Sequence, residues 1–129
     1  MPTRASGSFD VKVVPQPGVE GSPIGRMTID KTFHGDLDAT SVGEMVTTAT
    51  ESAGSRVYVA LERVTGTLAG RSGSFVLMHA GTMTRQGMSL SVTVAPASGT
   101  GALAGISGTL TITIVDKQHL YDFDYILGD

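Results

Sequence analysis

Hydrophobic residues recur at every second position along most of the chain, which is the period of a β-strand with one buried face. Residues 8–14, 26–33 and 119–127 each show this alternation. The apolar or aromatic positions are Phe9, Val11 and Val13 in the first stretch, Met27, Ile29 and Phe33 in the second, and Tyr121, Phe123 and Tyr125 in the third. The pattern predicts a β-strand over each stretch.

A glycine-rich segment occurs twice. Residues 65–73 (Thr65-Gly-Thr-Leu-Ala-Gly-Arg-Ser-Gly73) return 35 positions later as residues 100–108 (Thr100-Gly-Ala-Leu-Ala-Gly-Ile-Ser-Gly108), and seven of the nine aligned residues are identical. Alternating apolar residues flank both copies, so each copy predicts a hairpin of strand, turn and strand. The expected pairs are residues 56–64 with 74–83, and residues 89–95 with 109–115.

The segments between the strands are less regular. Residues 15–25 hold three prolines and three glycines, which predicts a loop, and residues 1–7 are expected to be loosely ordered. Residues 36–50 suit either a strand or a short helix, and their threonines favour a strand. Residues 116–118 form a short turn before the last strand.

About eight strands joined by short connections suit a small closed barrel, because closure removes exposed strand edges. We therefore expect an all-β fold in which residues 1–129 form a single antiparallel eight-stranded closed barrel, similar to calycins and lipocalins in shape. Val57, Val59 and Leu61 are apolar on the face opposite Tyr58 and Ala60. An apolar outer face predicts burial against a neighbouring subunit, hence a homo-oligomer.

Composition narrows the classes of function. The net charge is −3 without a basic stripe, so we expect no nucleic acid partner. The chain has no cysteine, which excludes disulfide and thiolate chemistry. No apolar run is long enough to span a membrane, and no signal-like segment opens the sequence, so a cytoplasmic location without membrane contact is expected. The glycines lack the spacing of a dinucleotide or phosphate loop, and no cofactor is expected.

Several segments identify a resemblance. They are residues 29–37 (Ile29-Asp-Lys-Thr-Phe-His-Gly-Asp-Leu37), Gly43-Glu-Met45, residues 58–68, residues 70–77, His79, Ser98-Gly-Thr-Gly101, His119, Tyr121 and Tyr125. Together they resemble an uncharacterised bacterial family, the domain of unknown function thirty-two twenty-four. The glycine turns also resemble those of allene oxide cyclase and dirigent-type barrels. The resemblance implies an allene-oxide-cyclase-like barrel with a cavity, and it implies no reaction.

Three polar residues are candidates for catalysis. His79 lies on the same strand face as Phe75 and Leu77, and the aligned residue after the second glycine segment is Ile114. A histidine at this inward position is either an acid–base group in a cavity or a buried structural histidine. Glu62 is in phase with Tyr58. Unless it is paired, burial should raise its pKa toward that of a general base; otherwise it forms a salt bridge with a nearby arginine. Tyr58 either donates its O–H to a substrate or caps the core.

A larger set is expected to bind the ligand: Phe75, Leu77, Tyr121, Phe123, Tyr125, Glu44 and Arg71. Arg71 could hold a carboxylate, although a solvated turn charge is the simpler interpretation. His34, Asp36 and Asp38 share one strand face, but no other histidine or cysteine lies nearby, so no metal site is expected. His119 either joins the cavity wall or stands beside the turn.

Three functions remain open. The first is a barrel that binds a small hydrophobic molecule, with His79, Glu62 and Tyr58 orienting it. The second is a cofactor-free isomerase or cyclase, in which Glu62 or His79 moves a proton while the cavity holds the substrate folded. The third is a filled barrel that acts through oligomeric or partner contacts.

Overall fold

The computed structural model describes residues 3–17, 20–49, 55–84 and 86–127, and within these ranges every regular element is a strand. The strands are β1 (Thr3–Gln16), β2 (Ile24–Gly35), β3 (Leu37–Ala49), β4 (Arg56–Leu68), β5 (Arg71–Thr84), β6 (Gly87–Val94), β7 (Thr100–Gly101), β8 (Ser107–Val115) and β9 (Gln118–Ile126). Within residues 36–50, for which a short helix was the alternative, Leu37–Ala49 is the strand β3 and Asp36 lies at the bend before it. The described part of the chain has no helix that could cross a membrane.

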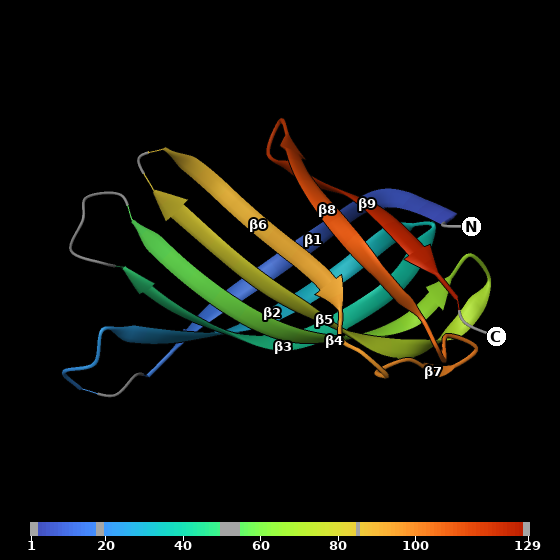
Figure 1. The fold of residues 1–129 in the computed structure, drawn as a ribbon, viewed down its shortest axis with the longest axis horizontal. Helices are drawn as coiled ribbons and strands as arrows, with labels where there is room; N and C mark the ends of the chain where they lie inside the picture. Colours follow the sequence, from blue (N-terminus) through green and yellow to red (C-terminus); the bar gives the residue numbers. More distant parts are fainter. Residues whose placement is uncertain (1–2, 18–19, 50–54, 85, 128–129) are drawn as a thin grey trace.

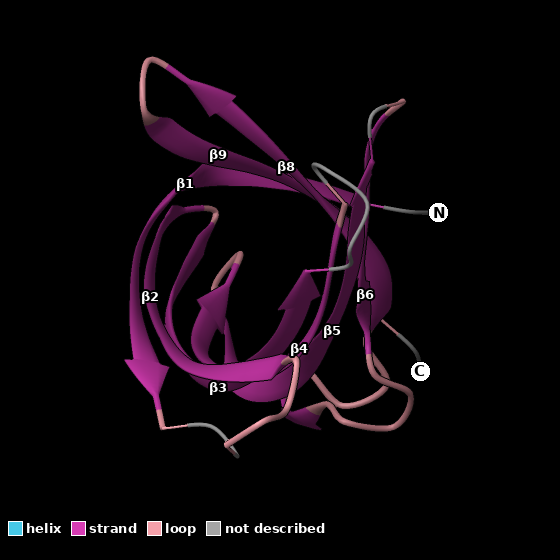
Figure 2. Cartoon of the chain, turned by 90° about the vertical axis from the view of Figure 1, so that its left-hand side faces the viewer, coloured by secondary structure: helices cyan, strands magenta, loops and turns pink. Residues whose placement is uncertain are grey.

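The strands form a closed antiparallel barrel. Around the barrel the order is β1, β2, β3, β4, β5, β6, β8 and β9, with β9 returning to β1 (Figures 1 and 2). The short strand β7 adds to the side of β5 beyond the end of β6. The prediction of an all-β, eight-stranded closed barrel is confirmed, with β7 as one extra strand.

The β4–β5 and β8–β9 hairpins both have tight two-residue connections. β4 and β5 are joined by Ala69 and Gly70, and β8 and β9 by Asp116 and Lys117. All four residues have positive φ angles, between 49° and 84°. Two consecutive residues with positive φ define the turn whose twist matches that of the flanking strands. The first predicted hairpin is confirmed, since the β4–β5 ladder runs from Arg56 opposite Met83 to Leu68 opposite Arg71.

One half of the barrel interior is packed solid. The side chains there are at most 7% exposed and include Phe33, Leu37, Leu68, Phe75, Leu77, Leu103, Phe123 and Tyr125. Phe75 stacks on Phe123, with ring centroids 5.7 Å apart, and Phe123 lies 5.3 Å from Tyr125. Aromatic contacts of this kind add to the free energy gained by burying the rings. This packed half is the hydrophobic core.

Two expectations about chain ends and loops are wrong. Residues 1–7 were expected to be loosely ordered, yet β1 begins at Thr3 and Ala5 is only 2% exposed; residues 1 and 2 lie outside the described residues. The strand forms because Thr3 to Phe9 pair with β9, which closes the barrel. The Pro/Gly loop is shorter than residues 15–25, since Pro15 and Gln16 still pair with β2, which begins at Ile24.

The second predicted hairpin is also wrong in its extent. β6 and β8 share the single residue pair Thr93–Thr109, whereas β8 pairs along its length with β9. The second glycine segment forms a connection that folds over one end of the barrel, and it buries Leu103 and Ile106 there. Ile106 stands where the first copy has the exposed Arg71. An apolar residue at that position favours a buried plug over a solvated turn, so near-identical sequences adopt different structures.

Candidate functional site

Four polar side chains meet inside the barrel, one from each of four consecutive strands: Lys31 on β2, Ser41 on β3, Glu62 on β4 and His79 on β5. Lys31 lies directly opposite Ser41 in the ladder. Glu62 lies opposite Gly43, where a Cβ atom would come within 2.7 Å of the Glu62 Cβ. All four residues are buried, and they are named the ionic cluster below.

The Glu62 carboxylate is the centre of the ionic cluster. Its Oε1 accepts hydrogen bonds from Lys31 Nζ at 2.9 Å and from His79 Nε2 at 2.6 Å, and its Oε2 accepts one from Ser41 Oγ at 2.5 Å. The side chains of Glu62, His79 and Lys31 are 0%, 4% and 7% exposed. Buried charges persist in proteins when they are paired in this way.

These contacts determine the protonation state of Glu62. Burial acts to raise the pKa of the carboxyl group, but the hydrogen bonds from His79 and Ser41 and the charge of Lys31 outweigh it and lower the pKa from 4.5 to about 2. The alternative expectation, an unpaired carboxyl group with a raised pKa, is therefore wrong. A salt bridge does form, with Lys31 and His79 in place of the arginines considered from the sequence.

The ionised carboxylate in turn orients His79. Because Glu62 can only accept hydrogen bonds at this pKa, the proton between the two side chains belongs to His79 Nε2. His79 Nδ1 has no hydrogen-bond partner among the described residues. No fully enclosed polar side-chain atom in those residues lacks a partner, so Nδ1 retains accessible surface. His79 is one of the residues that line the interior cavity.

The ammonium group of Lys31 is held by aromatic faces as well as by Glu62. Its Nζ lies 4.8 Å from the centre of the Phe9 ring and 5.8 Å from that of Phe33. Cation–π attraction is strongest where water is excluded. Sequence reasoning missed Lys31, although a signal existed: it shares the face of Met27, Ile29 and Phe33 and interrupts an otherwise apolar stripe. Ser41, in a weakly patterned stretch, gave no comparable signal.

The half of the barrel beyond the ionic cluster is hollow. A cavity of about 390 Å³ reaches from His79 and Lys31 toward one end, and a second region of about 370 Å³ continues to the mouth. The two regions share Met45, Tyr58, Met88 and Leu90. Apart from the ionic cluster the walls are mainly apolar, and methionines recur among them: Met27, Met45, Met83 and Met88. Methionine adapts its shape readily to different apolar ligands.

Tyr58 lies at the wall of this hollow half, as its phase predicted, and it lines both regions. Its ring packs against Gly81, where a Cβ atom would stand 2.3 Å from the Tyr58 Cε1. Burial and the nearby Glu62 charge raise the pKa of its hydroxyl group. Tyr58 therefore keeps its proton at neutral pH and can donate a hydrogen bond to a ligand.

The other predicted ligand-binding residues divide into two groups, neither of which lines the cavity. Phe75, Leu77, Tyr121, Phe123 and Tyr125 all point inward but belong to the packed half, where their exposure is 6% or less. The Tyr121 hydroxyl group donates to the backbone oxygen of His34 and accepts from the backbone N–H of Leu37, so it ties strand ends together. The alternation of residues along the strands correctly assigns these side chains to the inner face. It does not indicate which half of the barrel interior is filled by side chains.

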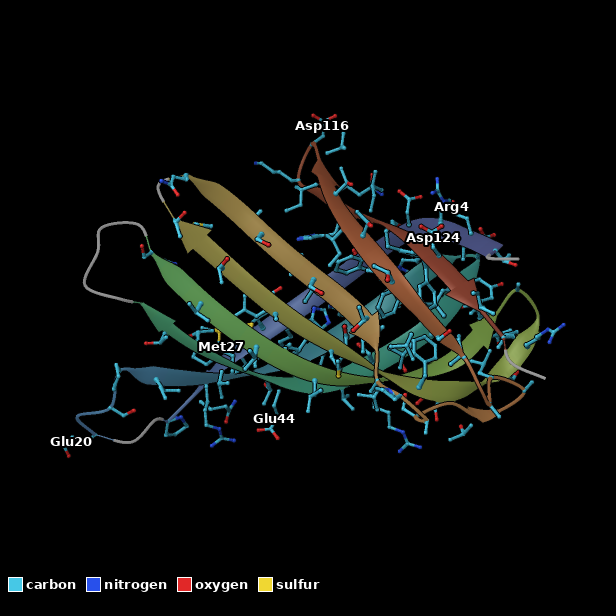
Figure 3. All side chains as sticks on the ribbon, viewed as in Figure 1. Arg4, Glu20, Met27, Glu44, Asp116 and Asp124 are labelled. Carbon is cyan, nitrogen blue, oxygen red and sulfur yellow. The ribbon has the colours of Figure 1, made fainter. Side chains whose placement is uncertain are left out.

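Glu44 and Arg71 are exposed and lie away from the cavity. Glu44 projects outward from β3, where it pairs with Arg26 at 2.8 Å (Figure 3), and Arg71 follows the β4–β5 turn. His34 pairs with Asp10 at 3.0 Å on the outer surface, and the described residues contain no cluster of three potential metal ligands. His119, in contrast, lines the cavity and packs on Phe9 with ring centres 5.1 Å apart.

The outer face of β3, β4 and β5 carries aliphatic side chains in an open groove of about 850 Å³. Val42, Val46, Val59, Leu61 and Met78 are between 37% and 62% exposed there. Val59 and Leu61 are among the side chains on which the expectation of a homo-oligomer rests, and the oligomer stays a prediction.

The molecule is thus a closed β-barrel with one packed half, one hollow half and a buried ionic cluster between them. The family model described as "Protein of unknown function (DUF3224)" matches residues 5–125, and the chain belongs to this family. The resemblance to this family inferred from the sequence is confirmed. The likeness to allene oxide cyclase stays a prediction.

A solved structure supports the fold. A protein of unknown function from the DUF3224 family of the bacterium Shewanella oneidensis, known from a crystal structure, is 46% identical in sequence to this chain. The similarity covers 100% of both chains with a TM-score of 0.92. No curated protein matches the chain.

Proposed function

We propose that the barrel binds a small, mainly hydrophobic molecule in its hollow half. The observation that carries this proposal is the cavity of about 390 Å³, which has mainly apolar walls and is also lined by His79, the histidine held by Glu62. Small-molecule sites are typically cavities of a few hundred Å³ with mainly apolar walls and a few placed polar groups. An interior that is hollow over half its length supports binding over a purely structural barrel.

The polar groups indicate what kind of molecule fits. His79 Nδ1 accepts a hydrogen bond as long as Nε2 carries the only ring proton, and Tyr58 donates one. Methionine and aliphatic side chains make up much of the remaining wall, and polar side chains, among them Arg56 and three threonines, join them in the region toward the mouth. A ligand with an apolar body and a single hydroxyl group satisfies both requirements, because a hydroxyl group can donate one hydrogen bond to Nδ1 and accept another from Tyr58.

A second candidate is a cofactor-free isomerase or cyclase, and the orientation of His79 favours it. A carboxylate that fixes one ring nitrogen of histidine leaves the other nitrogen free to take a proton, and it stabilises the imidazolium that forms. Glu62 with a pKa of about 2 is a poor base near neutrality. In this scheme His79 moves the proton, and Glu62 holds the ring in position.

Native mass spectrometry of the purified protein tests the binding proposal first. We expect a retained small molecule, or saturable binding of the neutral fluorophore N-phenyl-1-naphthylamine with about one site per chain. A protein that neither retains a molecule nor binds the fluorophore would contradict the proposal and favour a structural role.

The variants H79Q and E62Q separate binding from catalysis once a ligand is known. Under the binding proposal both variants lower affinity. Under the catalytic candidate both abolish turnover while binding persists, because a proton acceptor is lost in the first and its orienting group in the second. Glu44→Gln, which changes an exposed pair away from the cavity, is the matched control and should alter neither property.

A further inference from the structure

The barrel is closed by only one residue pair at the seam between β6 and β8. β6 and β8 are joined by the pair Thr93–Thr109 alone, whereas the shortest of the other ladders around the barrel, between β1 and β9, contains seven pairs. Beyond Thr93–Thr109 the β8–β9 hairpin bends away from β6 (Figure 2). Along this stretch the facing edges of β6 and β8 make no ladder pairs with each other among the described residues.

The side chains along this seam are complementary in the register that the one pair defines. Continuing the antiparallel ladder from Thr93–Thr109 would place Ser91 opposite Thr111 and Ser89 opposite Thr113 on the outside. The same register would place Val92 opposite Leu110, Leu90 opposite Ile112 and Met88 opposite Ile114 on the inside. Hydroxyl pairs outside and aliphatic pairs inside are the cross-strand combinations that stabilise antiparallel sheets.

The inner side chains of the seam are uncovered in the open arrangement. Met88, Leu90 and Ile114 are 71%, 38% and 63% exposed, although each occupies the inward phase of its strand. Residues of both β6 and β8, among them Leu90 and Ile112, line the cavity of about 390 Å³. The seam is therefore a gap in the cavity wall, bordered by apolar side chains that would be covered if the two strands paired.

We propose that the seam between β6 and β8 is the portal through which the hydrophobic ligand enters, and that the strands pair in this register to close the barrel over it. This inference rests on the proposed function. The two-residue turn at Asp116 and Lys117 keeps β8 joined to β9 along nine residue pairs, so the hairpin can move as one unit. Pairing would bury Met88, Leu90 and Ile114 and satisfy two rows of backbone groups.

An engineered disulfide tests the proposal, and the absence of cysteine makes the chain suitable. Ser89→Cys combined with Thr113→Cys bridges the strands only when they pair, because a disulfide needs Cα atoms within about 7 Å. The matched control is Thr93→Cys with Thr109→Cys, at the position already paired. Along each strand, the two cysteine positions are four residues apart. Antiparallel ladders alternate between two kinds of residue pair, so pairs separated by an even number of residues are of the same kind and have equivalent geometry.

We expect both variants to form an intramolecular disulfide under mild oxidation. In the Ser89/Thr113 variant, oxidation should slow the exchange of N-phenyl-1-naphthylamine, measured by stopped-flow fluorescence, about tenfold or more, and reduction should restore it. In the control, oxidised and reduced protein should exchange the fluorophore equally fast.

Other results would overturn the inference. Failure of the Ser89/Thr113 variant to oxidise, while the control does, would show that the strands do not pair in this register. A bridge without slower exchange would show that the ligand does not pass through the seam. Disulfide-linked dimers would indicate that a second chain occupies it. If the reduced protein does not bind the fluorophore at all, the proposed function fails and the portal fails with it, whereas strand pairing is still decided by the bridge.

Discussion

The ionic cluster makes the stability of the barrel depend on pH, and Glu62→Gln is the perturbation that reveals it. The variant keeps the size of the side chain but removes the charge that compensates Lys31. The carboxyl pKa falls from 4.5 to about 2 in the folded protein. At about 1.4 kcal/mol for each pKa unit, this shift corresponds to roughly 3 kcal/mol of stability at neutral pH. Breaking a buried ion pair typically costs a similar 3–5 kcal/mol.

The sign follows from the direction of the shift. Because the folded pKa lies below the unfolded one, the contribution of Glu62 is complete above about pH 5 and is lost as the pH falls toward 2. Urea unfolding from pH 8 down to pH 2 should therefore show Glu62→Gln about 3 kcal/mol less stable than the parent at pH 7. This difference should shrink through the acid range, where the parent carboxyl group also becomes neutral.

Two comparisons keep this test decisive. Glu44→Gln, which breaks an exposed pair with Arg26, should cost less than about 1 kcal/mol. If Glu62→Gln does not fold, adding Lys31→Met removes the uncompensated charge and should recover part of the loss. A difference between the parent and Glu62→Gln that stays constant from pH 7 to pH 2 would refute the reasoning, as would one no larger than that of Glu44→Gln.

Three other substitutions test the packing of the two halves and of the outer face. Gly81→Ala pushes the Tyr58 ring into the cavity and should weaken N-phenyl-1-naphthylamine binding about tenfold in a fluorescence titration. Leu103→Ala leaves a void in the packed half and should cost about 2–5 kcal/mol in urea unfolding, whereas Val42→Ala on the surface should cost less than about 0.5 kcal/mol. Leu61→Lys places a charge on the apolar outer face and should reduce the mass seen by light scattering to that of one 13.3 kDa chain; a parent that is already monomeric would contradict the oligomer.

Much of the barrel could be predicted because one face of nearly every strand is buried. Phe9, Phe33 and Phe75 lie on the face that the alternation assigns to the interior, and so do Glu62 and His79. The alternation of every second residue determines which side chains share a face of a strand. The repeated glycine segment correctly predicted that β4 pairs with β5. The family resemblance was likewise readable from the sequence.

The features that could not be predicted depend on position along the barrel axis, about which alternation says nothing. Tyr121 and Tyr58 are both inward aromatic residues, yet the first is bonded to strand ends in the packed half and the second lines the cavity. The partner of Glu62 was missed because Lys31 lies 31 residues away in sequence, and only the strand order brings the two side chains together. The sequence shows that Ile106 replaces Arg71 in the second glycine segment, but it does not show that this segment then forms a buried connection in place of a hairpin turn.

The division of the interior separates the side chains that hold the fold together from those that line the proposed binding cavity. Phe33, Leu68 and Phe123 sustain the structure from one end. Met27, Met45 and Met88 shape the space at the other end, and substitutions there remove few contacts from the core. Relatives could therefore accumulate new side chains around the mouth while keeping the same scaffold, and ligand preference would diverge faster than architecture. The same separation makes the mouth the natural place to introduce a new specificity by design.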